Sequence, residues 1–267
     1  MNKLQFLVAV SLLLMPRLAA AQLSLGVSPL RVELAVAPGD TKTDVITVQN
    51  LSPEAVRMHV SIADWYFAPD GTPTFVKRGN LPTFSMSDWI EVNPTEFEVP
   101  GLGAVPLRYT VTVPPAVQAA GYRAAVLIES VPDMAEGPRA NVTYLNARIA
   151  VMVYDRVGQI PINVEIAGQD VAPDPERPGN SVLRLTLKNT GLAEVRLKGE
   201  IHITSQPAGA LQIVPFPEAV ILPQSDRHVS VPLGASLPAD GFTVLSQLDV
   251  GLPELLEAET RVGSPSR

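Results

Sequence analysis

Apolar and polar residues alternate along most of the chain after residue 22, in short runs separated by turn residues. The clearest runs are Val45–Val48, Val56–Val60, Leu107–Val113 and Ala124–Ile128. Successive side chains of a β-strand point to opposite faces, so a period of two is typical of strands with one buried face. No long stretch has the helical period. Many short strands between turns predict an all-β protein built as β-sandwiches.

The dipeptide Asp70-Gly71 predicts a tight turn between two such runs, because Asp-Gly is favoured in short connections between antiparallel strands. The runs on either side are Trp65–Phe67 and Thr74–Val76. We therefore expect a β-hairpin here.

The chain contains one internal repeat. Residues 46–62 (ITVQNLSPEAVRMHVSI) align without a gap with residues 185–201 (LTLKNTGLAEVRLKGEI), which places Asn50 on Asn189. Two further motifs recur in the same order: Val99-Pro100 with Leu222-Pro223, and Gly121-Tyr122 with Gly241-Phe242. The repeat predicts two similar sandwich domains, residues 22–158 and 159–262, followed by a short tail, residues 263–267.

Residues 1–21 have the features of a signal peptide. Lys3 precedes an apolar stretch of 12 residues, Leu4–Met15, and Ala19–Ala21 forms an A-x-A cleavage site. The alternative is a membrane anchor, but the stretch is too short to span a bilayer. We expect an exported chain that begins at Gln22 and is not inserted in the membrane.

The composition excludes several classes of function. The 267 residues include 20 basic and 27 acidic ones, net charge −7, with 46% hydrophobic and 18% charged residues. Without a basic cluster the chain is a poor nucleic-acid binder. The absence of cysteine from the sequence excludes disulfides and thiolate chemistry, so core burial alone must stabilise the fold.

No catalytic or metal-binding motif is written in the sequence. The three histidines, His59, His202 and His228, are isolated from one another. There is no H-x-x-x-H pair, no G-x-S-x-G elbow and no glycine-rich phosphate loop. We expect a protein that is not an enzyme and uses no metal or cofactor.

Arg31 is the first candidate functional residue. It follows Ser28-Pro29, which interrupts a strand pattern over Leu23–Leu34. An arginine early in a first strand can face a cleft and donate several N–H bonds to a carboxylate. The alternative is a solvent-facing arginine paired with Glu33.

The second candidate is a long strand, Val142–Tyr154. One set of alternate residues is apolar and predicted to face the core: Leu145, Ala147, Ile149, Val151 and Val153. The other set is mixed and is the candidate binding face: Val142, Tyr144, Asn146, Arg148, Ala150, Met152 and Tyr154. An exposed edge with such a face suits the addition of a partner's strand. The alternative, equally open here, is a strand buried on both sides by the second domain.

Several segments, in this order and spacing, resemble the first domain of periplasmic pilus-assembly chaperones, the PapD-like family. They are residues 26–34 (GVSPLRVEL), 47–50 (TVQN), 88–101 (DWIEVNPTEFEVPG), 111–115 (VTVPP), 121–132 (GYRAAVLIESVP) and 147–156 (ARIAVMVYDR). The second half resembles the family's second domain only in outline.

The resemblance implies two immunoglobulin-like β-sandwich domains in tandem, set around a cleft, in the periplasm. It implies a chaperone that donates the last strand of its first domain to a secreted pilus or fimbrial subunit. It also allows an outer-membrane usher as a second partner. No cofactor is implied.

The resemblance also assigns roles. Arg31 matches the cleft arginine that anchors the client's terminal carboxylate. The accompanying lysine falls at about Ala150, where alanine cannot bind a carboxylate, so Arg148, on the same face, is the candidate substitute. The alternative function is a structural or adhesive envelope protein that uses the fold without donating a strand.

Overall fold

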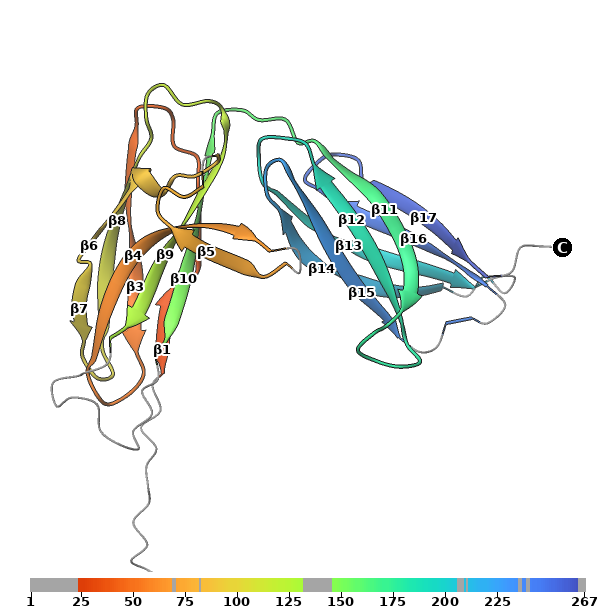
Figure 1. The fold of residues 1–267 in the computed structure, drawn as a ribbon, viewed down its shortest axis with the longest axis horizontal. Helices are drawn as coiled ribbons and strands as arrows, with labels where there is room; N and C mark the ends of the chain where they lie inside the picture. The colour runs from red at the N-terminus through yellow and green to blue at the C-terminus, as the bar shows by residue number, and fades with distance from the viewer. Residues whose placement is uncertain are drawn as a thin grey trace, which may run out of the picture.

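The computed structural model describes residues 24–68, 71–81, 83–131, 146–205, 209, 211–234, 237–238 and 241–263. The predicted signal peptide, residues 1–21, lies outside these ranges. Within them the regular structure is β-strand, apart from the short 3-10 helix η2 (Ser87–Trp89). The predicted all-β class is confirmed. The strands form two sandwiches joined by one linker, shown at the top of Figure 1.

The first sandwich consists of two sheets. One has the order β1-β3-β8-β6, and the other has the order β2-β10-β9-β4-β5, with β7 paired to β4. Their strands are β1 (Leu25–Ser28), β2 (Arg31–Leu34), β3 (Thr41–Asn50), β4 (Val56–Phe67), β5 (Pro73–Lys77), β6 (Ile90–Asn93), β7 (Glu96–Val99), β8 (Ala104–Thr112), β9 (Ala120–Ser130) and β10 (Arg148–Val157).

The second sandwich has sheets of order β11-β12-β15 and β14-β13-β16-β17. Its strands are β11 (Val164–Pro173), β12 (Ser181–Asn189), β13 (Val195–Ser205), β14 (Leu211–Ile221), β15 (Ser225–Gly234), β16 (Phe242–Asp249) and β17 (Leu256–Val262).

The internal repeat of the sequence corresponds to a repeat in the order of the strands. The repeated segments lie on β3–β4 and β12–β13, and the order β7-β4-β9-β10 of the first sandwich corresponds to β14-β13-β16-β17 of the second. In both sandwiches the opposite sheet pairs an early strand with the strand that follows the Val-Pro or Leu-Pro motif. The two halves of the chain therefore use one pattern to build two cores.

Alternation along each strand produces these cores. Ile46 and Val48 of β3 and Leu107 of β8 are fully buried between the first two sheets. Leu183, Leu185 and Leu187 of β12 are buried in the same way between the sheets of the second sandwich. Each buried aliphatic side chain contributes about 1.5–3 kcal/mol of transfer free energy, which is how a chain without disulfides holds its fold.

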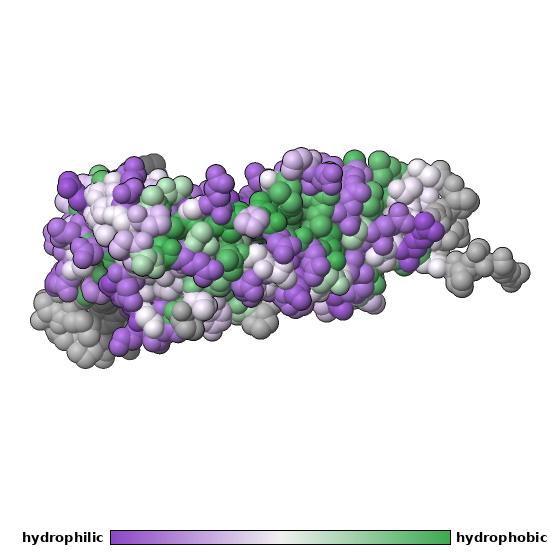
Figure 2. Space-filling model, turned by 90° about the horizontal axis from the view of Figure 1, so that it is seen from above, coloured by the Kyte–Doolittle hydropathy of each residue, from purple (hydrophilic) through white to green (hydrophobic). Residues whose placement is uncertain are grey.

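A third apolar cluster lies at the junction of the two sandwiches, and we call it the junction cluster. Its buried members are Ala63, Trp65, Ala125, Leu127, Tyr154 and Leu222. Leu222 follows β14 of the second sandwich, and the others belong to strands of the first. Seen from above, hydrophobic residues gather where the sandwiches meet and over the adjoining part of the second (Figure 2).

The hairpin predicted around Asp70-Gly71 is confirmed as β4–β5, with Trp65 opposite Phe75. Gly71 has φ +85°, which favours glycine. Asp70 lies outside the described residues.

Candidate functional site

The N-terminal strand changes sheets at the predicted interruption. β1 ends at Ser28 and pairs with β3 in one sheet, whereas β2 begins at Arg31 and pairs with β10 in the other. The pairing of β2 with β10 is parallel and places Arg31 opposite Met152. The interruption at Ser28-Pro29 therefore decides where β10 acquires its second neighbour.

β10 is covered on both sides over only part of its length. Met152–Asp155 lie between β9 and β2, whereas Arg148–Val151 pair only with β9 among the described strands. We call Arg148–Val151 the open edge. The Met152 amide donates to the Leu30 carbonyl at 3.0 Å. Because strand geometry repeats every two residues, the backbone groups of Ala150 and Arg148 point to the same, open side.

The structure extends the predicted strand at its C-terminal end. Within the described part of the chain the strand begins at Arg148 and continues to Val157. Val142 and Tyr144 lie outside the described residues. Asn146 is exposed just before β10. The candidate face is therefore described only from Asn146 onward.

The alternation predicted the two faces of β10 correctly at Val151 and Val153, whereas Ala147 and Ile149, also predicted to face the core, are only half-buried. Val151 and Val153 are fully buried in the first core. Ala150 and Met152 are half-buried against the junction cluster. The expectation that Tyr154 faces a client is wrong, because it is only 5% exposed.

Tyr154 is buried because the second sandwich covers it. Its ring meets Trp65 edge-on at 5.7 Å, and the guanidinium of Arg196 lies 5.0 Å above it. Burial is the main reason that the pKa of Tyr154 lies above its ordinary value. The C-terminal end of β10 is therefore covered by the second sandwich, as one of the two interpretations of the sequence expected. The open edge, Arg148–Val151, fits the other interpretation, a strand exposed for pairing.

Arg31 stands where the open edge ends and β2 begins. Its side chain is 50% exposed, with Nε 3.2 Å from Glu33 Oε1 and Nη1 3.6 Å from Oε1 of Glu218 on β14. The pairing with Glu33 is the alternative raised by the sequence. The guanidinium faces the second sandwich, but it is not free of internal partners. Its five N–H donors leave capacity for a further acceptor.

Arg148 lies apart from Arg31. It pairs with Glu129 of β9 and its side chain is 59% exposed. It lies four positions before Met152, the partner of Arg31, which corresponds to about 13 Å along a strand. The structure thus does not bring the two arginines together, and each stands at one end of the open edge.

Sequence reasoning missed the charged groups from the second sandwich. Arg196 Nε lies 2.8 Å from Glu33 Oε1, and Arg156 Nη2 lies 3.6 Å from Glu194 Oε1. Burial raises the pKa of Glu194 above its ordinary value. Arg196 occupies the repeat position of Arg57, but the repeat carries no information about contacts between domains.

A buried arginine lies beside this network. Arg123 is opposite Tyr154 in the β9–β10 register, and its Nε donates to the Trp65 carbonyl at 3.0 Å. Burial lowers its pKa to about 10, although nearby Tyr154, Asp64 and Glu194 act in the opposite direction. The group stays a cation at neutral pH and adds positive charge to the junction.

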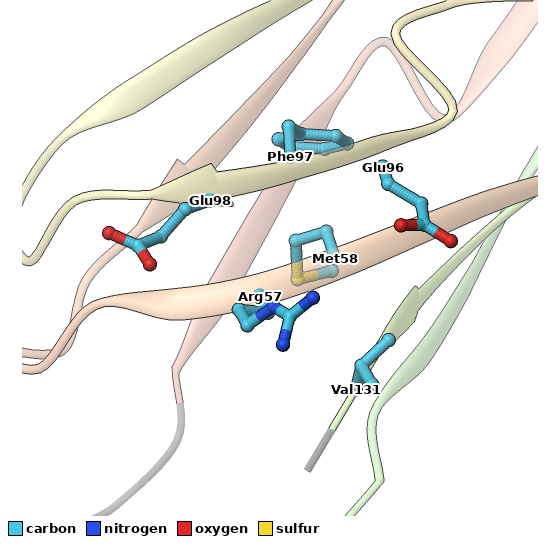
Figure 3. Close-up of a pocket in the computed structure, with 6 residues that line it drawn as sticks. All are labelled: Arg57, Met58, Glu96, Phe97, Glu98 and Val131. Atoms are coloured by element: carbon cyan, nitrogen blue, oxygen red, sulfur yellow. The ribbon is translucent and has the colours of Figure 1, made fainter. Parts of the chain in front are cut away.

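One hollow lies at the beginning of the open edge, and a second lies beside it, at strands β4 and β7. The first, of about 460 Å³, is lined by His59, Glu129, Ser130, Val131, Asn146, Ala147 and Arg148. The second, of about 310 Å³, is lined by Arg57, Met58, Glu96, Phe97, Glu98 and Val131 (Figure 3). Figure 3 shows Arg57, Glu96 and Glu98 extending from neighbouring strands β4 and β7. Val131, which is 41% exposed, lines both hollows, so they adjoin each other.

No cluster of three or more potential metal ligands occurs in the described part of the chain. In those same ranges no helix has the length and apolar character needed to cross a membrane.

The chain matches no protein-family model, and no curated protein is similar to it in sequence. Solved structures similar to it include the class 5 fimbriae chaperone CfaA, with 13% identity, 91% of this chain and 100% of that chain covered, and a TM-score of 0.49. The E. coli chaperone DraB has 15% identity, coverage of 91% and 99%, and a TM-score of 0.42.

The Pseudomonas aeruginosa CupB2 chaperone has 15% identity, coverage of 87% and 96%, and a TM-score of 0.42. These three structures are chaperones, and the first is named as a chaperone of fimbriae.

Proposed function

We propose that the protein is a periplasmic chaperone that captures secreted pilus or fimbrial subunits by pairing the open edge of β10 with a strand of the client. The observation that carries this proposal is the one-sided pairing of Arg148–Val151. Main-chain groups on an unpaired edge supply affinity in strand addition, and alternate side chains supply fit.

The position of Arg31 supports the same proposal. A client strand beside the open edge would run in line with β2 and end where β2 begins, next to Leu30 and Arg31. A terminal carboxylate at that point would meet a half-exposed guanidinium that can donate two parallel bonds. Arg148, at the other end, would contact the client's side chains rather than its terminus.

Client capture in this scheme requires no nucleotide. A strand-paired client leaves when it finds a better-matched strand during assembly, so exchange of one pairing for another drives release. An outer-membrane usher is a candidate site for that exchange.

Proline substitution at Ala150 tests the proposal. The Ala150 amide points to the open side, so Ala150→Pro removes a donor for the client while leaving the β9–β10 hydrogen bonds in place. The tagged exported protein is isolated and its stoichiometric companions are identified by mass spectrometry. We expect a β-rich secreted subunit with the unchanged chain and its loss with Ala150→Pro, at an unchanged circular dichroism spectrum.

The matched control is Ala104→Pro, at an exposed position of β8 in the opposite sheet. The amide of Ala104 lies on the same side of β8 as position 106, which is already proline, so the strand tolerates the change. This variant should keep the companion. Retention of the companion by Ala150→Pro would contradict strand pairing at the open edge. A chain that isolates without any companion, while associating with copies of itself, would favour a structural or adhesive role.

A further inference from the structure

The β4–β5 hairpin leaves the first sandwich and reaches the second (Figure 1). Near its tip, Arg227 of β15 donates from Nη1 to the Gly71 carbonyl at 3.0 Å. The same guanidinium lies 4.2 Å from the ring centroid of Phe67. A planar cation over an aromatic face is a favourable contact, strengthened where water is excluded. One side chain of the second sandwich thus holds both the backbone and a ring of the hairpin.

The backbone conformation at Gly71 favours glycine, and the missing side chain also leaves room for the guanidinium of Arg227. A Cβ at Gly71 would lie 2.6 Å from both terminal nitrogens of Arg227. Any other residue would therefore push the guanidinium away from the hairpin. The close fit indicates that the tip of the β4–β5 hairpin packs directly against the Arg227 guanidinium.

The base of the hairpin is fixed by the junction cluster. Trp65 meets Phe67 edge-on at 5.2 Å, and Phe67 and Phe75 pack against the buried members of the cluster. Val220 of β14 packs on the same cluster. The aromatic side chains of the hairpin consequently fill the space between the two sandwiches.

A second, separate contact lies near the linker. The Gly121 amide donates to the Leu192 carbonyl at 2.7 Å, and Arg156 donates to the Glu194 carbonyl at 3.0 Å. Figure 1 shows the linker crossing at the top and the hairpin crossing lower down. One contact leaves two bodies free to rotate about it, whereas two separated contacts fix their orientation.

We infer that Arg227 is a positioning residue, which clamps the β4–β5 hairpin to the second sandwich and so sets the angle between the two sandwiches. That angle decides where Glu218 of β14 stands relative to Arg31 at the end of the open edge. The clamp itself depends only on contacts within the chain. Its consequence for client binding rests on the proposed function.

Distance measurement between the sandwiches tests the clamp. The chain has no cysteine, so Thr47→Cys and Ser230→Cys, both exposed, provide two unique sites for spin labels. Double electron–electron resonance should give one narrow distance distribution in the otherwise unchanged protein. Arg227→Ala should broaden or shift it, because the contact at the tip of the hairpin is lost and only the contacts closer to the linker and at the junction cluster remain.

Two further variants separate the clamp from other effects. Gly71→Ala, which acts from the other side of the contact, should broaden the distribution in the same way. Arg227→Lys keeps the charge but not the planar group, so it should restore the narrow distribution only in part. Arg184→Ala, on an exposed position of β12, is the matched control and should change nothing.

Circular dichroism accompanies each measurement and shows whether the β structure is retained. An unchanged narrow distribution in folded Arg227→Ala would overturn the inference, as would full rescue by lysine. Because no client is present in the experiment, its outcome is independent of the proposed function. Loss of client capture with an unchanged distance distribution would point to the open edge instead.

Discussion

Asn50 and Asn189 make the same hydrogen bonds in the two sandwiches. Each is buried at the end of a strand, and its Oδ1 accepts from the amide two residues later, Ser52 or Gly191, at 2.9 Å. Each Nδ2 carries two N–H donors and lies within hydrogen-bond distance of three carbonyl oxygens. The acceptors belong to Glu54, Val99 and Pro100 in the first sandwich and to Ala193, Ile221 and Leu222 in the second. The sequence repeat therefore preserves one hydrogen-bonded turn, which an asparagine at the end of a strand forms in each sandwich.

Replacing either asparagine should destabilise the protein. Asn50→Ala or Asn189→Ala leaves buried carbonyls without a donor, and each loss should lower the free energy of unfolding by about 1–3 kcal/mol. Urea unfolding followed by fluorescence and circular dichroism measures the change. Gln49→Ala, on the exposed neighbour in the same strand, should cost far less. Equal effects of Gln49→Ala and Asn50→Ala would contradict a stabilising role for the asparagine hydrogen bonds.

The two faces of β10 should respond differently to charge. Val153→Asp places a carboxylate in the first core and should reduce the free energy of unfolding by at least about 3 kcal/mol. Met152→Glu, at the half-buried junction face, should cost less and should loosen the contact between the sandwiches. Urea unfolding and the spin-label distance described above distinguish the two effects. A larger loss of stability for Met152→Glu would reverse the assignment of faces.

Arg31 should matter more for client capture than for stability. Its side chain is half-exposed, so Arg31→Ala should change the free energy of unfolding by less than about 1 kcal/mol. If a client carboxylate binds there with its charge desolvated, capture should weaken by about 2–5 kcal/mol. Arg31→Lys should retain only part of the affinity for the client, because lysine cannot donate two parallel hydrogen bonds. Titration of the identified subunit measures both variants.

Arg148→Ala should show a smaller loss in the same titration, because this arginine lies away from the expected carboxylate. Unchanged affinity in both Arg31→Ala and Arg148→Ala would exclude a carboxylate anchor at either end of the open edge. Client binding would then depend on strand pairing alone.

Asp64 should make stability fall in acid. It is fully buried, and burial by itself raises its pKa. Hydrogen bonds from Ser85 and from the Leu81 amide lower the pKa further than burial raises it, so the folded-state pKa lies below the usual value. The stabilisation is therefore present above the unfolded-state pKa of about 4 and is lost as the pH falls through the folded-state value.

Asp64→Asn should remove this component of the acid dependence. Urea midpoints measured between neutral pH and acid would reveal it as a shallower decline in the variant. Asp88→Asn, at an exposed position paired with Arg78, is the control and should retain most of the decline. An equally steep decline in Asp64→Asn would show that other carboxylates govern acid unfolding.

The sequence alone predicted what depends on local pattern. Alternation identified the core residues Val151 and Val153, the Asp-Gly pair identified the β4–β5 hairpin, and the aligned asparagines identified the repeat. Each of these signals is written within a few residues of the structure that it predicts. The domain boundary near residue 158 stays a prediction.

Contacts between the two sandwiches could not be predicted from local sequence patterns. The burial of Tyr154 depends on Arg196, and the partners of Arg31 include Glu218, which lies in a strand of the other half of the chain. Alternation places both Tyr154 and Arg31 on the outer face of their sheet, where solvent is the usual neighbour. Only the packing of one sandwich on the other shows what covers that face.

In the proposed mode of client binding, the switch of the N-terminal strand between sheets makes β2 a tethered competitor of the client for β10. A client strand longer than the open edge must displace β2 one residue pair at a time, beginning at the pair of Arg31 and Met152. Because β2 is covalently attached, its effective concentration at β10 is high, and it favours clients that stop at the end of the open edge. If clients bind as proposed, the place of Ser28-Pro29 in the chain limits how far a client strand can extend.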